Sequence, residues 1–407
     1  MAIALAGLGC VRPDAIEQEG DALRIGALLS YTGDLAASGT NSEQAMRMAL
    51  DLVNDAGGVA GKPLRLVLRD THSNAERART RAESLFDESG LIGLIGPPET
   101  ESIRLIAPMV AERRIADVLP TLTAPRITEY PKSFWFRLAP SAETAGCVLA
   151  EQLYREQVDS MAVFFREDAF NRALAEATAA RFRQVSILAP PSVDLVVFDP
   201  NQQTFLTALQ ETQAKKPDVI VLATSPGSGA LVIADSLALE EKPRWYLSPA
   251  LRTEQFLRNV PPAALDGATG VSPLPSKDAA AFASAYAARW AGEEPLPESF
   301  YHYDALALLA LAAESAAFEA GGPPSPEAVR DHVGRVSTGA GTAVHWNELG
   351  QGLELLRAGS PVNYFGVSSQ LDLTESGELE KSIALLRFWH IKDSAFEDDR
   401  LGSCFVR

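Results

Sequence analysis

Short apolar runs alternate with amphipathic runs along most of the chain. The run at 23–30 is apolar over nearly its whole length, which is typical of a strand buried on both faces of a sheet. Apolar side chains recur at helical spacing over 43–56, and Gly57 and Gly58 end that segment. The same alternation predicts further strands at 64–70, 91–96 and 115–120, with a helix that begins near 73–76 and another at 101–113.

A second series of the same kind begins at residue 161. It predicts strands at 161–165, 193–199, 218–223 and 244–249, separated by helices at 170–182, 203–214 and 229–239. Apolar strands of this length, separated by single helices, indicate parallel sheets that helices cover on both faces. Two such series predict an α/β fold with two lobes of similar build.

Composition narrows the possible functions. A chain of 407 residues is too long for one ordinary core, so two or three domains are expected. The formal net charge of −17 argues against a nucleic-acid partner, because binding to phosphates requires a basic face. No apolar run approaches the roughly 18 residues that span a bilayer.

The first ten residues, MAIALAGLGC, are apolar and end in a cysteine. They resemble the end of a bacterial lipoprotein signal, in which a small residue such as Gly9 precedes a lipid-bearing cysteine such as Cys10. The basic start is missing, and Gly7 stands where a leucine is usual. Residues 1–22 are therefore interpreted as a leader and linker with a lipid anchor at Cys10; the alternative is a frayed N-terminus with a chance cysteine.

Two other cysteines, Cys147 and Cys404, are too few for a disulfide framework and are compatible with two free thiols.

Small polar residues follow several predicted strands. In an open parallel sheet, ligands bind beyond the carboxyl ends of the strands, where backbone amides and helix N-termini are free. In the first series these positions are Ser30, Asp70, 96–100, Thr121 and Thr123, and in the second they are 166–170, 199–201, 224–229 and 249–255. Two such rims, facing each other, would make a cleft.

Several motifs in succession resemble those of the type I periplasmic binding proteins of the leucine/isoleucine/valine-binding group. They are LLSYTGDLAASG, LVNDAGGVAGKPLRLVLRD, LIGLIGPPETES, PTLTAPRIT, FWFRLAPSAETAG, FYHYDALALLALA and VNYFGVSSQLDLTESGEL, and the resemblance runs from about residue 23 to about 397. It implies two Rossmann-like lobes of parallel sheet flanked by helices and joined by three crossover segments. In that family the lobes close over a small solute and deliver it to an ABC permease in the membrane, which places the protein in the periplasm or cell envelope.

The resemblance also implies the extent of the lobes. The first lobe is expected to hold residues 23–140 and 273–376, and the second residues 141–272 and 377–407.

In the first lobe, the resemblance implies that three threonines hold the carboxylate of the solute. Thr100 supplies a hydroxyl past the third strand, and past the fourth strand Thr121 supplies a backbone group and Thr123 a hydroxyl. A small hydroxyl beside free amides can donate a charge-assisted hydrogen bond to a carboxylate. The alternative is that these threonines only cap helices.

In the second lobe, the chain departs from the family pattern. Phe170 stands where an aromatic hydroxyl is usual, Ser225 follows the next strand, and Ala250 occupies the position of the acid that takes the ammonium of the solute. A buried ammonium without a partner is costly, so the ligand is expected to keep a carboxylate or amide and to lack a free α-ammonium. Another acid could substitute at Ala250, and by position the candidates are Asp168, Asp199 and Glu254, although each also suits a solvated loop or a helix cap.

No pattern in the chain supports catalysis, a metal site or a cofactor. HExxH, P-loop and GxSxG motifs are absent, and the five histidines show no metal-ligand spacing. The leading hypothesis is a solute receptor for an ABC importer with a small-molecule ligand and a permease partner. The alternatives are a ligand sensor on the same fold that signals to a protein partner, and a degenerate binder whose cleft is no longer used.

Overall fold

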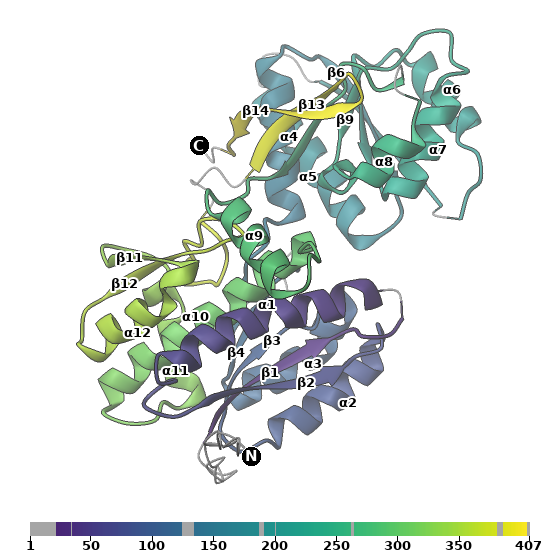
Figure 1. The fold of residues 1–407 in the computed structure, drawn as a ribbon. Helices are drawn as coiled ribbons and strands as arrows, with labels where there is room; N and C mark the ends of the chain where they lie inside the picture. Colours follow the sequence, from purple (N-terminus) through teal and green to yellow (C-terminus); the bar gives the residue numbers. More distant parts are fainter. Residues whose placement is uncertain are drawn as a thin grey trace, which may run out of the picture.

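The computed structural model describes residues 22–33, 35–123, 134–186, 191–199, 201–261, 264–380 and 386–404. Within these ranges the chain forms two α/β lobes, each built on its own sheet (Figure 1). The predicted fold of two lobes with parallel sheets flanked by helices is confirmed. Cys10 lies outside the described residues.

The first lobe contains a five-stranded parallel sheet with the strand order β2-β1-β3-β4-β5. Its strands are β1 (Leu23–Leu29), β2 (Leu64–Asp70), β3 (Leu91–Ile95), β4 (Ala116–Leu119) and β5 (Trp135–Arg137). Successive side chains of the central strands point to opposite faces. Ala27 and Ile95 therefore join the cluster that contains α1 (Ala36–Asp55) and α10 (Pro297–Ala320). Leu28 and Leu94 join the one that contains α2 (Ala75–Phe86) and α3 (Thr100–Arg113).

The second lobe contains a seven-stranded sheet with the order β14-β13-β10-β9-β8-β6-β7. Its parallel strands are β6 (Ser160–Arg166), β7 (Ser192–Phe198), β8 (Val219–Ala223), β9 (Trp245–Leu247) and β10 (Thr269–Pro273). Two antiparallel strands, β13 (Leu386–Lys392) and β14 (Ala395–Gly402), extend one edge. The helices of this lobe are α4 (Ala142–Arg155), α5 (Ala169–Val185), α6 (Leu206–Ala214), α7 (Pro226–Ser236) and α8 (Glu254–Asn259).

Between β10 and β13 the chain returns to the first lobe. The segment forms α9 (Ala279–Arg289), α10, α11 (Pro326–His332), β11 (Thr342–His345), α12 (Leu349–Arg357) and β12 (Val362–Phe365). Hydrogen bonds tie it to α1: the Tyr286 hydroxyl donates to the Asn41 carbonyl at 3.2 Å, and Arg357 donates to the Ala56 carbonyl at 2.8 Å. The first lobe is therefore discontinuous in sequence. The exact boundaries at 140, 273 and 376 stay a prediction.

Two helices begin earlier than the hydrophobic pattern predicts. Helix α1 starts at Ala36 rather than at residue 43, because its first turns are small and polar and carry no apolar periodicity. Helix α7 starts at Pro226 rather than at residue 229. Proline suits a first helical position, since its fixed φ is already helical and its missing amide hydrogen would have no partner there.

Two short crossover segments set how the sheets face each other. β5 ends at Arg137 and α4 begins at Ala142, while β10 ends at Pro273 and α9 begins at Ala279. An extended chain covers only about 3.3–3.6 Å per residue, so these links cannot run around either sheet. Both links leave from the carboxyl ends of parallel strands. The carboxyl edges of the two sheets therefore face the space between the lobes.

The third crossover, between β12 and β13, is fastened by one buried carboxylate. Asp304 of α10 is fully buried. Its Oδ1 accepts from the Tyr364 hydroxyl at 2.7 Å and the Val367 amide at 2.9 Å, and its Oδ2 accepts from the Ser368 amide at 2.8 Å. Burial raises the pKa of Asp304 to about 6, although these hydrogen bonds act to lower it.

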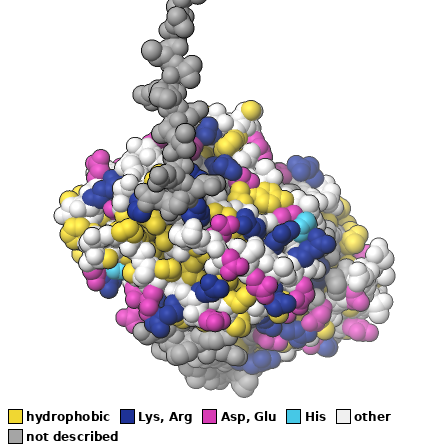
Figure 2. All heavy atoms as spheres, turned by 90° about the horizontal axis from the view of Figure 1, so that it is seen from below, with side chains coloured by type: hydrophobic (Ala, Val, Ile, Leu, Met, Phe, Trp, Pro, Cys, Tyr) yellow, Lys and Arg dark blue, Asp and Glu magenta, His cyan; other side chains and the backbone are white. Residues whose placement is uncertain are grey.

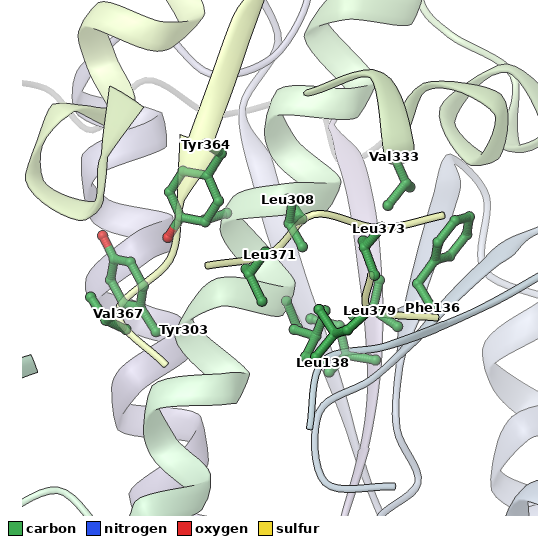
Figure 3. Packing of buried hydrophobic residues seen from close by; sticks show 14 of the residues in the cluster. Phe136, Leu138, Tyr303, Leu308, Val333, Tyr364, Val367, Leu371, Leu373 and Leu379 are labelled. Carbon is green, nitrogen blue, oxygen red and sulfur yellow. The ribbon is translucent and has the colours of Figure 1, made fainter. Parts of the chain in front are cut away.

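Apolar packing continues along this crossover. Figure 3 shows Leu371, Leu373 and Leu379 of the third crossover packed near Leu138, which lies in the first crossover. Arg137 joins the same two segments, because its amide donates to the Gly377 carbonyl at 2.8 Å and its Nε lies 2.9 Å from Glu378 Oε2. The first and third crossovers are thus held together at their first-lobe ends.

The suggestion of two free thiols is wrong. Cys147 on α4 and Cys404, just after β14, form a disulfide across 257 residues of sequence. The sequence distance hid this pairing, because only the antiparallel edge strands bring the C-terminal segment back to α4. A disulfide that closes so long a loop stabilises a fold by about 2–5 kcal/mol.

One buried acid of the first lobe works against stability at neutral pH. Asp117 on β4 is fully buried, and neither carboxylate oxygen has a hydrogen-bond partner within the described part of the chain. Burial holds its pKa well above the usual range. The folded state therefore favours the protonated carboxyl, and that preference stabilises the fold fully below about pH 4 and is lost as pH rises through the folded pKa.

We expect Asp117→Asn to raise the free energy of unfolding at pH 7, because it removes an ionisable group from an apolar site. The gain should shrink as the pH falls towards 4, where Asp117 is protonated in both states. Urea denaturation at pH 4, 5.5 and 7 measures this difference. Asp266→Asn, at an exposed turn position, is the matched control. Equal effects of both substitutions at every pH would contradict the assignment.

Candidate functional site

A pocket of about 210 Å³ opens at the carboxyl edge of the first-lobe sheet. It is formed where the end of β1, the segment before α3 and the residue after β4 meet the first turns of α1 and α10. The lining residues are Leu29, Ser30, Leu35, Ser38, Gly39, Ser42, Pro98, Thr121, Glu298 and His302. The close approach of α1 to β1 requires a glycine, since a Cβ at Gly39 would collide with the Ser30 carbonyl. The pocket thus lies on the rim where the sequence predicted ligand contacts.

His302 gives the pocket a hydrogen-bond acceptor. It is 3% exposed, and its Nδ1 lies 2.8 Å from the Glu298 carbonyl oxygen. A carbonyl can only accept, so Nδ1 carries the proton, and Nε2 is left as an acceptor while the ring is neutral. Burial lowers the pKa of His302 to about 4, so the ring is neutral at physiological pH.

Glu99 stands beside this pocket, between Pro98 and Thr100. It occupies the N-cap position of α3, but its side chain does not cap the helix. Instead, Glu99 Oε1 accepts from the Ser30 hydroxyl at 2.6 Å and the Thr71 hydroxyl at 3.2 Å, and Oε2 accepts from the Ser102 hydroxyl at 3.0 Å. All three donors are neutral hydroxyls. The first-lobe rim therefore contains a partly buried carboxylate that has no cationic partner among these contacts.

Sequence reasoning missed Glu99 as a site residue. The segment 96–100 was assigned to the rim, but only Thr100 was chosen from it. The signal was present in the sequence, since an acid directly before a predicted helix is favoured by the positive end of the helix dipole. What the sequence could not show is that the Glu99 carboxylate turns away from the α3 amides towards Ser30 and Thr71.

The three predicted threonines of the first lobe occupy different positions. Thr121 lines the pocket, and its buried Oγ1 has no hydrogen-bond partner within the described residues. Thr100 is the first residue of α3, next to Glu99. Thr123 follows β4, and its carbonyl accepts from the amide of Ala142, the first residue of α4, at 2.8 Å. The structure thus brings Ser30, Pro98 and Thr121 together, while Thr100 and Thr123 are near neighbours outside the pocket lining.

Asp70 organises the outer part of the same rim. It ends β2, and its Oδ1 accepts from the Tyr31 amide at 3.0 Å and the His72 amide at 2.8 Å. Burial opposes ionisation of Asp70, but these hydrogen bonds and one from the Thr32 hydroxyl outweigh it and lower its pKa. Asp70 therefore stays ionised and positions the loop after β1.

The predicted second-lobe residues lie on the opposite rim. Phe170 is in the first turn of α5, partly buried against the core. Ser225 is the N-cap residue of α7, and its hydroxyl lies 3.4 Å from the Ser228 hydroxyl. Ala250 is partly buried in the short 3₁₀ turn Pro249–Leu251. All three follow the carboxyl ends of parallel strands, as predicted, but whether they contact a ligand stays a prediction.

The acids considered as substitutes at Ala250 have other local roles. Asp168 caps α5, where its Oδ1 accepts from the Asn171 amide at 2.9 Å and its Oδ2 from the Asn171 side chain at 2.8 Å. Asp199 closes a turn by accepting from the Asn201 amide at 2.7 Å. Glu254 is exposed in the first turn of α8.

Donors rather than free acids characterise the second-lobe rim. Thr224 follows β8 and Ser248 follows β9, and both hydroxyls are fully buried without a hydrogen-bond partner within the described residues. Arg166 ends β6, and its Nε forms an ion pair with Asp168 Oδ2 at 3.5 Å but has no hydrogen-bond partner among the described residues. A guanidinium has five N–H donors, so Arg166 retains capacity to donate.

The described ranges contain no group of three or more His, Cys, Asp or Glu side chains that could hold a metal ion. In the same ranges, no helix combines the length and apolar character needed to cross a bilayer. Figure 2 shows Lys and Arg interspersed with Asp and Glu over the face seen from below.

The chain is similar in sequence to known solute-binding proteins. The model of a family described as periplasmic binding proteins matches residues 22–351. A chemotactic signal transduction system substrate-binding protein, BasB of Halobacterium salinarum, is 27% identical over 383 residues, covering 88% of this chain and 85% of that protein.

Two solved structures share the fold. The leucine-binding protein LivK of Thermotoga maritima has a TM-score of 0.71 at 20% identity, covering 94% of this chain and 99% of that one. The branched-chain amino acid transporter substrate-binding protein LivJ of Streptococcus pneumoniae, in complex with isoleucine, has a TM-score of 0.70 at 17% identity with the same coverage.

The buried neutral His302 predicts a loss of stability in mild acid. Its pKa falls from an ordinary value near 6.5 to about 4 on folding. The unfolded chain thus binds the proton first, and stability falls as pH drops from about 6.5 to 4, by up to about 3 kcal/mol. We expect His302→Asn, which can still donate to the Glu298 carbonyl, to reduce this slope in urea titrations at pH 4–7. His390→Asn, on the partly exposed β13, is the control, and an unchanged slope in His302→Asn would refute the assignment.

Proposed function

This chain belongs to the periplasmic binding protein family, whose members bind solutes and are not enzymes, and we propose that it is the extracytoplasmic solute-binding component of an ABC importer. Its solute is small and amino-acid-like, or carries a carboxylate or amide. The observation that carries the proposal is the 210 Å³ polar pocket on the first-lobe rim, which faces the carboxyl edge of the second sheet.

We propose that the solute binds between the two rims. Thr100, Thr121 and Thr123 contribute from the first lobe, and the segments at Phe170, Ser225 and Ala250 contribute from the second. Buried hydroxyls on both rims support this, since the side-chain oxygens of Thr121, Thr224 and Ser248 have no hydrogen-bond partner in the part of the chain that the structure describes. Buried polar groups are normally hydrogen-bonded, and a solute would satisfy them.

Binding is coupled to closure of the lobes. The three crossovers connect the lobes at the edge of both sheets, so rotation about them opens or closes the cleft. The Asp304 and Arg137 hydrogen bonds fasten the first-lobe ends of two crossovers, which leaves the remaining crossover residues to absorb the hinge motion. A solute that contacts both rims has a higher affinity for the closed state and shifts the equilibrium towards it. The closed form is then the one that docks on the permease.

An extracytoplasmic location is supported by the family and by the Cys147–Cys404 disulfide, because disulfides persist mainly in oxidising compartments. We propose that Cys10 carries a lipid anchor. Strand β1 begins at the amino edge of its sheet. A lipid anchor at Cys10 would therefore be attached to the first lobe on the side opposite the cleft.

A sensor is the second candidate function. The similarity to a substrate-binding protein of a chemotactic signal transduction system favours it. Such a sensor also closes on a small solute, but its closed form signals to a protein partner rather than delivering the solute to a permease. Copurification with a permease would favour the importer, and copurification with a signal transducer would favour the sensor.

A thermal-shift screen of the purified chain tests the proposal. The panel contains branched-chain, polar and aromatic amino acids, amides, aromatic acids and short dicarboxylates. A solute present at 100 times its dissociation constant adds about 2.7 kcal/mol to stability, which should be visible as a rise in Tm. A hit is expected, and it should be reproduced by calorimetry. The absence of any shift would favour a degenerate binder.

The Thr123 hydroxyl is tested with the solute that the screen identifies. Thr123→Val keeps the shape of the side chain and removes the hydroxyl. A hydrogen bond to a charged group contributes about 1.5–3 kcal/mol, so the solute should bind roughly 10- to 150-fold more weakly in calorimetric titration. Thr80→Val, on the exposed side of α2, should bind like the parent. Equal affinity of all three proteins would remove Thr123 from the site.

A further inference from the structure

We infer that the first-lobe pocket receives a cationic nitrogen of the solute rather than its carboxylate. This inference rests on the proposed solute-binding function and gives the solute an orientation within it. It reverses the orientation that the family resemblance implies for the three threonines. The evidence is the combination of charge and hydrogen-bond acceptors around the pocket.

Acceptors dominate the polar groups at the pocket. Among the described residues that line the pocket, Glu298 is acidic and none is a Lys or Arg. His302 is neutral and offers Nε2 as an acceptor, because its Nδ1 is committed to the Glu298 carbonyl. The pocket hydroxyls of Ser38, Ser42 and Thr121 can accept as well as donate. An ammonium group, which has three donors and no acceptor, matches such a set.

Glu99 adds a second negative charge beside the pocket. Its hydrogen bonds to Ser30, Thr71 and Ser102 come from neutral hydroxyls, which hold the carboxylate in place without neutralising it. They occupy three of roughly four acceptor positions of a carboxylate, so one position remains for a ligand. A solute carboxylate placed here would meet like charge in a partly desolvated site, which disfavours its ionised form.

The same hydroxyls cannot serve a solute carboxylate at the same time. Ser30 and Thr71 are almost fully buried, and each bonds to the other or to Glu99. Donation to an incoming carboxylate would require them to release Glu99. The carboxylate of Glu99 thus takes up the donors that a solute carboxylate would need at the ends of β1 and β2.

The second-lobe rim has the complementary chemistry. It has no acid at Ala250, and Asp168 is engaged with Asn171. It offers the Arg166 guanidinium and the unpartnered hydroxyls of Thr224 and Ser248. An amino-acid-like solute would therefore place its ammonium towards Glu99 and its carboxylate or amide towards Arg166. The missing acid at Ala250 then does not exclude a solute with an ammonium group.

Charge-matched solutes separate the two orientations. One set consists of leucine, leucinamide, 3-methylbutylamine and 4-methylpentanoate, and a second set has the same four head groups on a phenyl side chain. Isothermal titration of the full chain should detect binding of members with an amine and none of the members with only a carboxylate. Binding of the carboxylate-only members by the unchanged chain would overturn the inference and leave the solute-binding function in place.

Substitution of Glu99 tests the residue itself. Glu99→Gln should lower the affinity for the amine-bearing solutes by about tenfold or more, because the substitution removes a partly buried carboxylate that would pair with the solute cation. Glu101→Gln changes the same net charge at an exposed position of the same helix and should leave affinity unchanged. The unliganded Tm of each variant reports whether it folds. Unchanged affinity in a folded Glu99→Gln protein, or stronger binding of carboxylates, would refute the inference.

Arg166 is tested separately from Glu99. Arg166→Gln should lower the affinity for leucine more than the affinity for leucinamide, because only leucine has a carboxylate that can bind the Arg166 guanidinium. Arg183→Gln, at an exposed position further along α5, is the control. Equal losses for leucine and leucinamide would contradict the orientation. If no member of either set binds the unchanged chain, the result counts against the proposed function itself, and the inference falls with it.

Discussion

The facing of the two carboxyl edges is the constraint on which the rest of this structure depends. It follows from two crossovers that leave β5 and β10 at their carboxyl ends and reach the next helix within a few residues. Parallel sheets expose their loops and helix N-termini at that edge, where the backbone amides are free to bind a ligand. Short crossovers therefore turn two separate binding edges into the two walls of one site.

The third crossover is longer than the other two, and its described residues, 366–380, contain no helix. Asp304 anchors it with hydrogen bonds from Tyr364, Val367 and Ser368, all buried beneath α10. A buried carboxylate is costly unless such bonds satisfy it. Here the hydrogen bonds also fix the path of the chain, so Asp304 holds the first-lobe end of the third crossover in one position. Asp117 shows the contrast, since it is equally buried but has no hydrogen bond to offset the cost within the described residues.

Family membership and site chemistry answer different questions about this protein. The family establishes a solute-binding fold, and structures that share less than 25% identity support the fold alone. The identity of the solute depends on local charges at the two rims. The resemblance aligns Ala250 of the second lobe with the acid that takes the solute ammonium, and the first-lobe rim has an acid of its own, Glu99. The two rims face each other, so these two positions are best interpreted together.

The sequence by itself determined the fold class, the order of strands and helices and the rim that carries Thr100, Thr121 and Thr123. These features follow from local periodicity, and the edge of a parallel sheet is defined by the direction of its strands. Tertiary structure alone decided that Cys147 meets Cys404, that Asp168 caps a helix and that Glu99 bonds to Ser30 and Thr71. Such pairings join residues far apart in the chain or depend on which way a side chain turns. Hydrophobic periodicity carries no information about either, because it records only which face of an element is buried.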